Sequence, residues 1–118
     1  MTVAHVRIEH HDGLPVAVLN GDVDAANAAR VTEELTTAMT NRAPALLVVL
    51  TEARYLDSAG INLLFRLHEQ LATRRQRFGL VLGESAQLRR ALEVAGVLDA
   101  IPVWEELPQA LAAIGGGD

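Results

Sequence analysis

Asp57 and Ser58 are the residues of this sequence whose types and position most directly suggest chemistry. They stand between a short apolar segment and a predicted helix, and either side chain can accept hydrogen bonds from the free backbone N–H groups of the first helical turn. The N-terminal end of a helix also favours negative charge, so a phosphate on Ser58 would be tolerated locally. The simpler alternative is a helix cap and nothing more, which contributes about 1 kcal/mol to stability.

The other chemistry-bearing side chains do not form a recognisable catalytic or metal-binding set. Asp22 and Asp24 flank Val23, but no placed histidine or lysine accompanies them. His10 and His11 are adjacent, so on a strand they face opposite sides, and no third ligand is evident. We therefore expect no catalytic residues, no metal site and no cofactor.

Composition disfavours several further classes of function. The net charge of −5 and the pI of about 5.3 supply no basic footprint for nucleic acid. The absence of cysteine excludes disulfides, thiolate zinc ligands and a cysteine nucleophile. Glycines 115–117 lack the Lys-Ser or Lys-Thr pair of a phosphate-binding loop, so nucleotide hydrolysis is not supported.

The 118 residues, half of them hydrophobic, fit one domain with one core. Residues 1–10 have neither a charged start nor a long apolar run, so we expect no signal peptide. The longest apolar stretch, residues 45–50, is far shorter than the roughly 20 residues that a membrane helix requires. We therefore expect a cytoplasmic protein without a membrane span.

The strand that must position Asp57 is predicted at residues 45–50, an unbroken apolar run. Its length suits a strand buried on both faces by helices, so it should lie centrally in a sheet. A loop over residues 51–56 and a helix over residues 58–75 are predicted to follow. In open α/β sheets, sites form at the carboxyl ends of such strands.

Strands and helices alternate along the rest of the chain. Residues 3–8 alternate in period two, and a turn at 11–13 joins them to a strand at 14–19 that ends at 20–22, which predicts a β-hairpin. The other predicted elements are a helix at 25–41, a strand at 78–82, a helix at 86–95 between Ser85 and Gly96, an edge strand at 100–104, a helix at 105–114 and a disordered tail at 115–118. The pattern indicates an α/β fold with a mixed, mostly parallel central sheet of about five strands and about four helices.

Two apolar stripes run along the predicted helix at residues 58–75. The first is continuous and rich in leucine, and we assign it to the core; it comprises Gly60, Leu63, Leu64, Leu67 and Leu71. The second stripe has Ser58 at its N-terminal end and comprises Ile61, Phe65, His68 and Ala72. It packs either on the helix at 86–95 or on a partner. If a partner docks there, phosphorylation of Ser58 adds about −1.5 to −2 charges beside the docking surface and should switch binding off.

Three segments resemble one known family. Residues 57–61, Asp-Ser-Ala-Gly-Ile, are similar to the Asp-Ser-Ser-Gly-Leu signature of STAS-domain anti-sigma-factor antagonists. Residues 19–24, Leu-Asn-Gly-Asp-Val-Asp, resemble the Gly-Glu-Leu-Asp turn of that family, and residues 92–97 resemble its helix ending in Gly-Leu. The resemblance spans nearly the whole chain and implies a STAS domain over residues 1–114.

The resemblance also implies a function. Ser58 would be the serine phosphorylated by an anti-sigma factor that is itself a serine protein kinase, and the unphosphorylated form would sequester that kinase and release a sigma factor. ATP would belong to the partner. The resemblance therefore implies that the protein is a bacterial regulator of transcription and not an enzyme. The partner-binding residues implied are Asp22, Asp24, Asn27, Asp57, Ser58, Ala59, Ile61, Asn62 and Phe65.

The sequence departs from the family pattern at three positions. Ala59 replaces a second serine, which leaves Ser58 as the only hydroxyl of the motif, whereas Asn62 replaces a common glycine and Asn27 a frequent threonine or serine. Two alternatives stay open: a structural STAS subunit of a lipid transporter or stress-signalling scaffold, in which Ser58 is dispensable, and a small enzyme or nucleotide-binding domain. We expect a monomer or a weak dimer.

Overall fold

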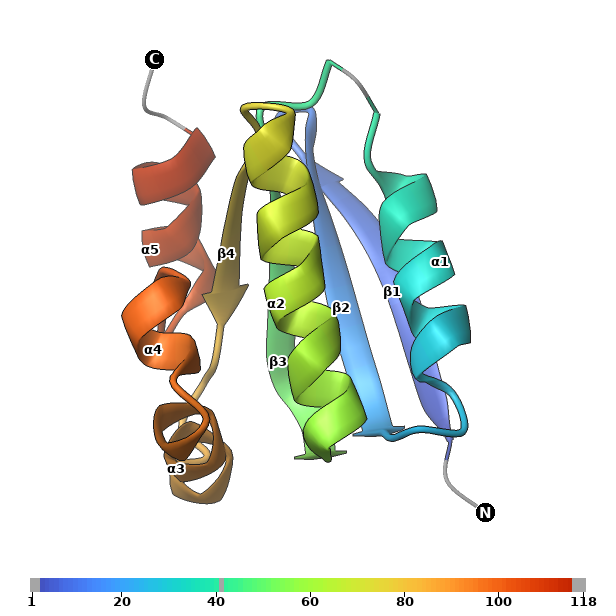
Figure 1. Cartoon of the computed structure of the whole chain (residues 1–118). Coiled ribbons are helices and arrows are strands. Elements are labelled where there is room, and N and C mark those ends of the chain that lie inside the picture. The colour runs from blue at the N-terminus through green and yellow to red at the C-terminus, as the bar shows by residue number, and fades with distance from the viewer. Residues whose placement is uncertain (1–2, 41, 116–118) are drawn as a thin grey trace.

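A five-stranded sheet in the order β1-β2-β3-β4-β5 forms the centre of the molecule, with β1 antiparallel to β2 and the other neighbours parallel (Figure 1). The computed structural model describes residues 3–40 and 42–115. The elements in chain order are β1 (Ala4–His11), β2 (Leu14–Val23), α1 (Ala28–Ala38), β3 (Ala45–Leu56), α2 (Ser58–Thr73), β4 (Arg77–Val81), α3 (Ala86–Val94), α4 (Val97–Ala100), β5 (Val103–Trp104), α5 (Leu107–Ala110) and η1, a π-helical turn (Leu111–Gly115). The predicted α/β class and mixed five-stranded sheet are confirmed.

The N-terminal hairpin closes through Asp12 and Gly13, the two residues between β1 and β2. Both have positive φ, 55° and 83°. That is the geometry of a type I′ turn, whose twist matches the flanking strands and which favours an Asp-Gly pair. The predicted hairpin is therefore correct, and its turn follows from local sequence alone.

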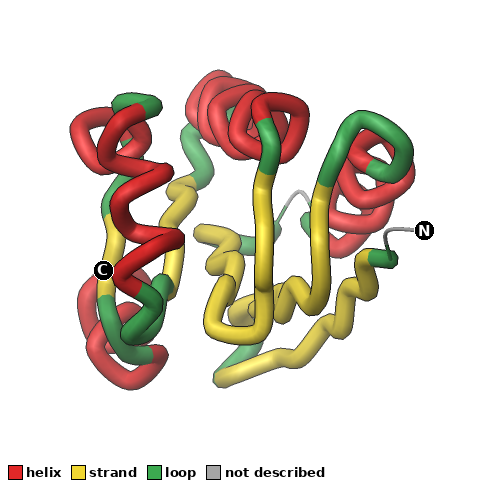
Figure 2. Tube along the Cα trace, turned by 90° about the horizontal axis from the view of Figure 1, so that it is seen from below, coloured by secondary structure: helices red, strands yellow, loops and turns green. Residues whose placement is uncertain are grey.

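The strand β3 is the centre of the core, as predicted. Its first six residues, 45–50, are at most 6% exposed. Leu46, Val48 and Leu50 point into the larger apolar cluster, beneath the helices, whereas Ala45, Leu47 and Val49 join a second cluster that contains Ala110 and Ile114. Figure 2 shows the helices in a row along one side of the strands and the C-terminal segment at the β5 end. Helices therefore cover both faces of the central strand.

The predicted loop at residues 51–56 is wrong, because these residues continue β3 and pair with the end of β2. The prediction that β2 ends at 20–22 is also wrong, since β2 runs to Val23. Between the pairs Val16–Leu47 and Val23–Leu56 the register shifts twice, and β3 advances by nine residues while β2 advances by seven. Backbone pairing does not require apolar side chains, so the polar composition of this segment concealed a bulged strand.

Smaller differences occur at the ends of elements. The helix α1 spans Ala28–Ala38 rather than 25–41, the short helix α4 was not predicted, and β5 has only two residues. Ser85 caps α3, and Gly96 follows its last turn with a φ of 83°, both as predicted. The predicted tail begins at 115, but η1 includes Gly115, and residues 116–118 lie outside the described part, as does residue 41 at the predicted end of the first helix.

Candidate functional site

The carboxyl ends of β2 and β3 meet at the N-terminus of α2, and Asp57 joins the three. Its Oδ1 accepts hydrogen bonds from the backbone N–H of Ala59, at 2.8 Å, and of Gly60, at 3.1 Å. Its Oδ2 accepts from the N–H of Ala25, at 3.3 Å, and its own N–H donates to the carbonyl of Val23, at 3.1 Å. The predicted cap is thus present, and it also ties the turn after β2 to the start of α2.

The turn between β2 and α1 is held by side chains of its own. Asp24 Oδ1 accepts from the N–H of Ala26 at 2.9 Å, and Asn27 Oδ1 accepts from the N–H of Asp24 at 3.0 Å. Asn27 Nδ2 donates to the carbonyl of Asp22 at 2.9 Å, and Asn27 is only 8% exposed. Asn27 therefore shapes this turn from within rather than presenting its side chain at the surface. The same bonds explain why residues 25–27 form a turn and not helix.

Ser58 is exposed at the first position of α2. Its hydroxyl forms no side-chain hydrogen bond with the described residues, whereas Asp57 takes the N–H groups of the first turn. Asn62 is exposed on the next turn, and Ala59 and Ile61 are half-buried. A modified Ser58 would therefore remain at the surface.

The two stripes of α2 separate as predicted. The residues of the first stripe are the buried residues of the helix. In the second stripe, Ile61 and Phe65 are half-buried and pack against the edge of the main core. Farther along, His68 and Ala72 line a cavity with Phe78 and residues of the C-terminal segment. The second stripe therefore runs along the side of α2 that faces β4 and the C-terminal segment, with Ser58 at one end.

Arg54 and Tyr55 belong to the same end of the sheet and were missed in the sequence. Arg54 Nη2 lies 3.4 Å from Asp22 Oδ2, and Tyr55 pairs with Asp22 across the strands while its residue surface is 56% exposed. Tyr55 is one of few large apolar residues of the described chain with such exposure. Only an assignment of residues 51–56 to a strand beside β2 could have indicated this placement.

Comparisons with known proteins match the sequence and the fold of this chain. Residues 5–110 match the family model of the STAS domain. The chain belongs to the STAS-domain family.

Relatives and solved structures of STAS proteins agree with this assignment. The anti-sigma-F factor antagonist RsfB of Mycobacterium tuberculosis is 26% identical over 95% of this chain and 90% of its own length. The anti-sigma-B factor antagonist of Listeria monocytogenes is 30% identical over 70% of this chain and 72% of its own. The crystal structure of an anti-sigma factor antagonist from Mycobacterium paratuberculosis superposes with a TM-score of 0.85 at 26% identity, covering 96% and 95% of the two chains.

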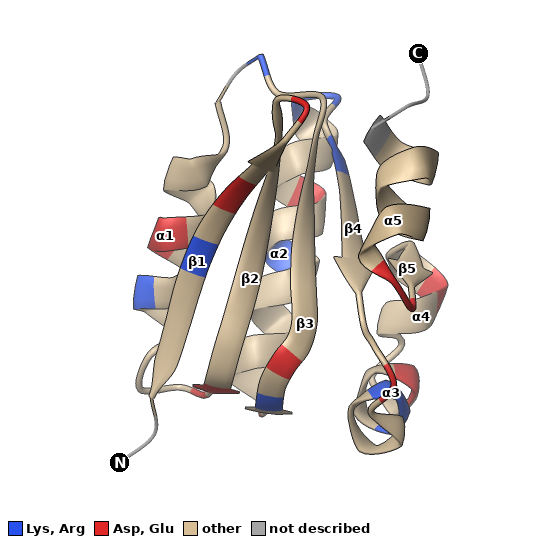
Figure 3. Ribbon diagram, turned by 180° about the vertical axis from the view of Figure 1, so that it is seen from behind, with Lys and Arg blue, Asp and Glu red and all other residues tan. Residues whose placement is uncertain are grey.

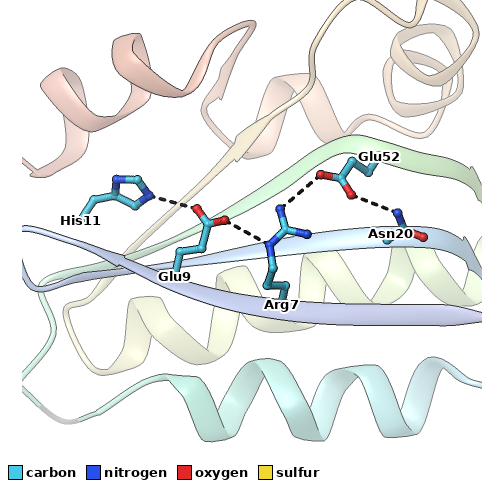
Figure 4. Close-up of polar contacts among 5 residues, drawn as sticks. All are labelled: Arg7, Glu9, His11, Asn20 and Glu52. Atoms are coloured by element: carbon cyan, nitrogen blue, oxygen red, sulfur yellow. Dashed lines mark hydrogen bonds and ion pairs between the residues drawn. The ribbon is translucent and has the colours of Figure 1, made fainter.

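This STAS domain carries a polar network on the rear face of its sheet, the face opposite α1 and α2 (Figure 4). Arg7 Nε donates to Glu9 at 3.1 Å and Arg7 Nη2 donates to Glu52 at 3.3 Å. Glu9 Oε1 also accepts from His11 Nε2 at 3.1 Å, and Glu52 Oε1 accepts from Asn20 at 3.0 Å. The network links β1 to β3 across β2. Figure 3 shows this face, with β1, β2 and β3 in front of α1 and α2.

Hydrogen bonds within this network shift three pKa values. The bond from His11, and then that from Arg7, holds the pKa of Glu9 below its ordinary value. The bond from Asn20, and then that from Arg7, lowers the pKa of Glu52 in the same way. The two carboxylates in turn raise the pKa of Arg7. All three groups are stabilised in their charged forms.

The described part of the STAS domain was also searched for a metal site and for a membrane-spanning helix. In the part of the chain that the structure describes, no three histidine, cysteine or acidic side chains gather as a metal site would require. No helix among the described residues has the length and apolar character needed to cross a membrane.

Proposed function

We propose that this protein is an anti-sigma-factor antagonist whose unphosphorylated form binds an anti-sigma factor with serine kinase activity, and that phosphorylation of Ser58 ends the binding. The single observation that carries the proposal is the position of Ser58, an exposed hydroxyl at the head of a half-buried apolar strip on α2. Two relatives are named as antagonists of anti-sigma factors, which supports an anti-sigma factor as the partner. In this proposal the chain acts in the cytoplasm, is not an enzyme and leaves ATP to its partner.

The proposed docking surface joins two segments at the carboxyl end of the sheet. The first is the turn at Asp22 and Asp24, shaped by Asn27, and the second is the start of α2. The surface residues of the second segment are Asp57, Ser58, Ala59, Ile61, Asn62 and Phe65. Phe65 lies about 10 Å from Ser58 along the axis, because each helical residue rises about 1.5 Å. Half-buried Ile61 and Phe65 would supply the apolar contact, and the carboxylates the specificity.

The effect of a phosphate follows from the cap. Asp57 Oδ1 already accepts the N–H groups of Ala59 and Gly60, so a phosphate on Ser58 would compete with a carboxylate for the first turn of α2. It would therefore project into solvent with about −1.5 to −2 charges, next to Asp57. Docking a partner over that charge would require its desolvation, which favours the free protein.

The test uses a candidate anti-sigma kinase, ATP and mass spectrometry of the intact protein and of its Ser58 peptide. We expect one phosphate, on Ser58. Affinity for the kinase should fall at least tenfold in the phosphorylated protein and in Ser58→Asp, and Ser58→Ala should bind but accept no phosphate.

The matched control is Ser85, the only other serine of the chain, which is also exposed and stands at the N-terminus of α3. Ser85→Asp should leave the affinity unchanged. Phosphate only on Thr51, an exposed residue of β3, or equal binding by Ser58→Asp and the unmodified protein, would contradict the switch and favour a structural STAS role.

A further inference from the structure

The strand β1 forms one edge of the sheet and is long and regular (Figure 1). Its eight residues pair with β2 without a register shift, whereas the strand at the opposite edge, β5, has only two residues. Many proteins blunt an edge strand with proline, a bulge or a very short length, because its free backbone groups can pair with a strand of another chain. None of these three devices is present in β1.

Alternate residues of β1 direct their backbone N–H and C=O groups away from β2. The carbonyl of Val3, just before β1, accepts a backbone N–H of β2 at 3.0 Å, whereas the carbonyl of Ala4 accepts from a side chain of α1. Because this direction alternates along an antiparallel strand, the backbone groups of Val6, Ile8 and His10 also face outward. These groups have no hydrogen-bond partner in the part of the chain that the structure describes.

The front side of this edge is open as well. Val6 and Ile8 are half-buried and pack against the main core. A groove of about 520 Å³ lies between them and α1, and the α1 residues that line it are Arg30, Glu33, Glu34 and Thr37. A strand added to β1 would therefore gain apolar contact with Val6 and Ile8 in addition to backbone hydrogen bonds.

We propose that a second copy of this chain occupies this edge, so that β1 pairs antiparallel with β1 of the second copy around a two-fold axis at Ile8. In this register Ile8 exchanges both backbone hydrogen bonds with Ile8 of the second copy, and Val6 does so with His10. The two sheets then form one continuous sheet. The inference goes beyond the proposed function and does not rest on it.

The charges on the rear side of β1 favour a second copy and this register. With the axis at Ile8, Arg7 lies directly opposite Glu9 of the second copy, and the two-fold symmetry repeats this opposite-charge pair. An axis at Arg7 would place two arginines opposite each other, and an axis at Glu9 would do the same with two glutamates. Arg7 is exposed, and within the described chain only its Nε and Nη2 donate, so Nη1 is available for the second copy.

The experiment is sedimentation equilibrium of the whole protein at concentrations up to about 1 mM. We expect a reversible dimer. Arg7→Glu and Glu9→Arg each place like charges opposite each other, so each should weaken dimerisation at least tenfold. An equimolar mixture of these two variants restores both opposite-charge pairs and should dimerise about as well as the unmodified protein. Arg66→Glu reverses the same charge at an exposed position of α2 and should leave the dimer unchanged.

A proline variant tests the edge independently of charge. His10 is exposed and its N–H faces away from β2, so the monomer tolerates His10→Pro, as edge strands do. In the dimer this variant removes the N–H that donates to Val6 of the second copy, and it should weaken dimerisation at least tenfold. Thermal unfolding checks that each variant is folded. A protein that stays monomeric at 1 mM, a variant mixture that associates no better than its components, or undiminished dimerisation of His10→Pro would each overturn the proposal.

Discussion

At the scale of single residues, Asp57 connects two segments that are more than thirty positions apart. Its carboxylate accepts two N–H groups of α2 and, at 3.3 Å, the N–H of Ala25 in the turn after β2. We expect Asp57→Ala to lower the free energy of unfolding by about 1–2 kcal/mol, since a lost cap costs about that much. Urea unfolding followed by circular dichroism measures the loss.

Ser58→Ala is the control for this prediction, because the neighbouring hydroxyl is exposed and caps nothing. Its effect should stay within about 0.5 kcal/mol, as for surface substitutions away from special features. If both variants lost the same stability, the carboxylate of Asp57 would not be the connection that its hydrogen bonds indicate. Ser58 would then be part of the structure and not only of the surface.

At the scale of elements, α2 ends in a conformation that its sequence does not favour. Arg75 has a φ of 58°, and the N–H of Gln76 returns to the carbonyl of Leu71 at 2.9 Å, so Arg75 occupies the left-handed position where glycine is usual. Arg75→Gly should therefore stabilise the protein by about 0.5–1 kcal/mol, because the left-handed strain exceeds the added flexibility of glycine. Arg74→Gly, at a φ of −97°, should not stabilise it, and a gain from both in thermal unfolding would point to lost charge instead.

The end of β2 depends on a glycine for space as well as for its backbone angle. Gly21 has a φ of 97°, and a Cβ there would lie 2.2 Å from the carbonyl oxygen of Val3, which accepts the N–H of Asp22 at 3.0 Å. Gly21→Ala should therefore cost more than the roughly 1–2 kcal/mol of left-handed strain.

Gly13→Ala separates the two causes, since Gly13 has a φ of 83° but a Cβ there would contact nothing within 4 Å. Its cost should be that of strain alone. Equal losses of urea-unfolding stability in the two variants would mean that the first strand simply shifts away from Gly21.

At the scale of the whole molecule, the two faces of the sheet are stabilised differently. Helices bury the front, whereas the rear combines a smaller apolar cluster beneath the C-terminal segment with the exposed charges of Arg7, Glu9 and Glu52, which link the first and third strands. Because the folded protein holds the pKa values of Glu9 and Glu52 below 4.5, their stabilisation is present above that pH and is lost as the pH falls through the folded values.

The matching prediction is a shallower acid dependence in Arg7→Met. Without the shared guanidinium, the pKa values of both glutamates should rise toward their ordinary value, and the urea midpoint should fall less between about pH 5 and pH 3. Arg66→Met removes the same charge from an exposed position of α2 and should follow the unmodified protein. Parallel pH profiles for all three proteins would show that the network contributes nothing to folding.

Local patterns predicted much of this protein. The Asp12-Gly13 turn, the leucine stripe of α2, the central strand at residues 45–50 and a helix cap at Asp57 or Ser58 were all correct, because each depends on residues close together in the chain. Periodicity indicates which face of an element is buried. That information is sufficient to predict the fold class and the N-terminus of α2.

Tertiary structure alone decided how those parts meet. The two register shifts in β3 place Tyr55 opposite Asp22, and the pairing of β1 with β2 brings Arg7 within reach of Glu52. The cavity beside Gln76 likewise joins α2 to a segment almost forty residues away. Strand register and cavity walls depend on contacts between residues that are distant in the sequence. No local pattern of apolar and polar residues predicts such contacts.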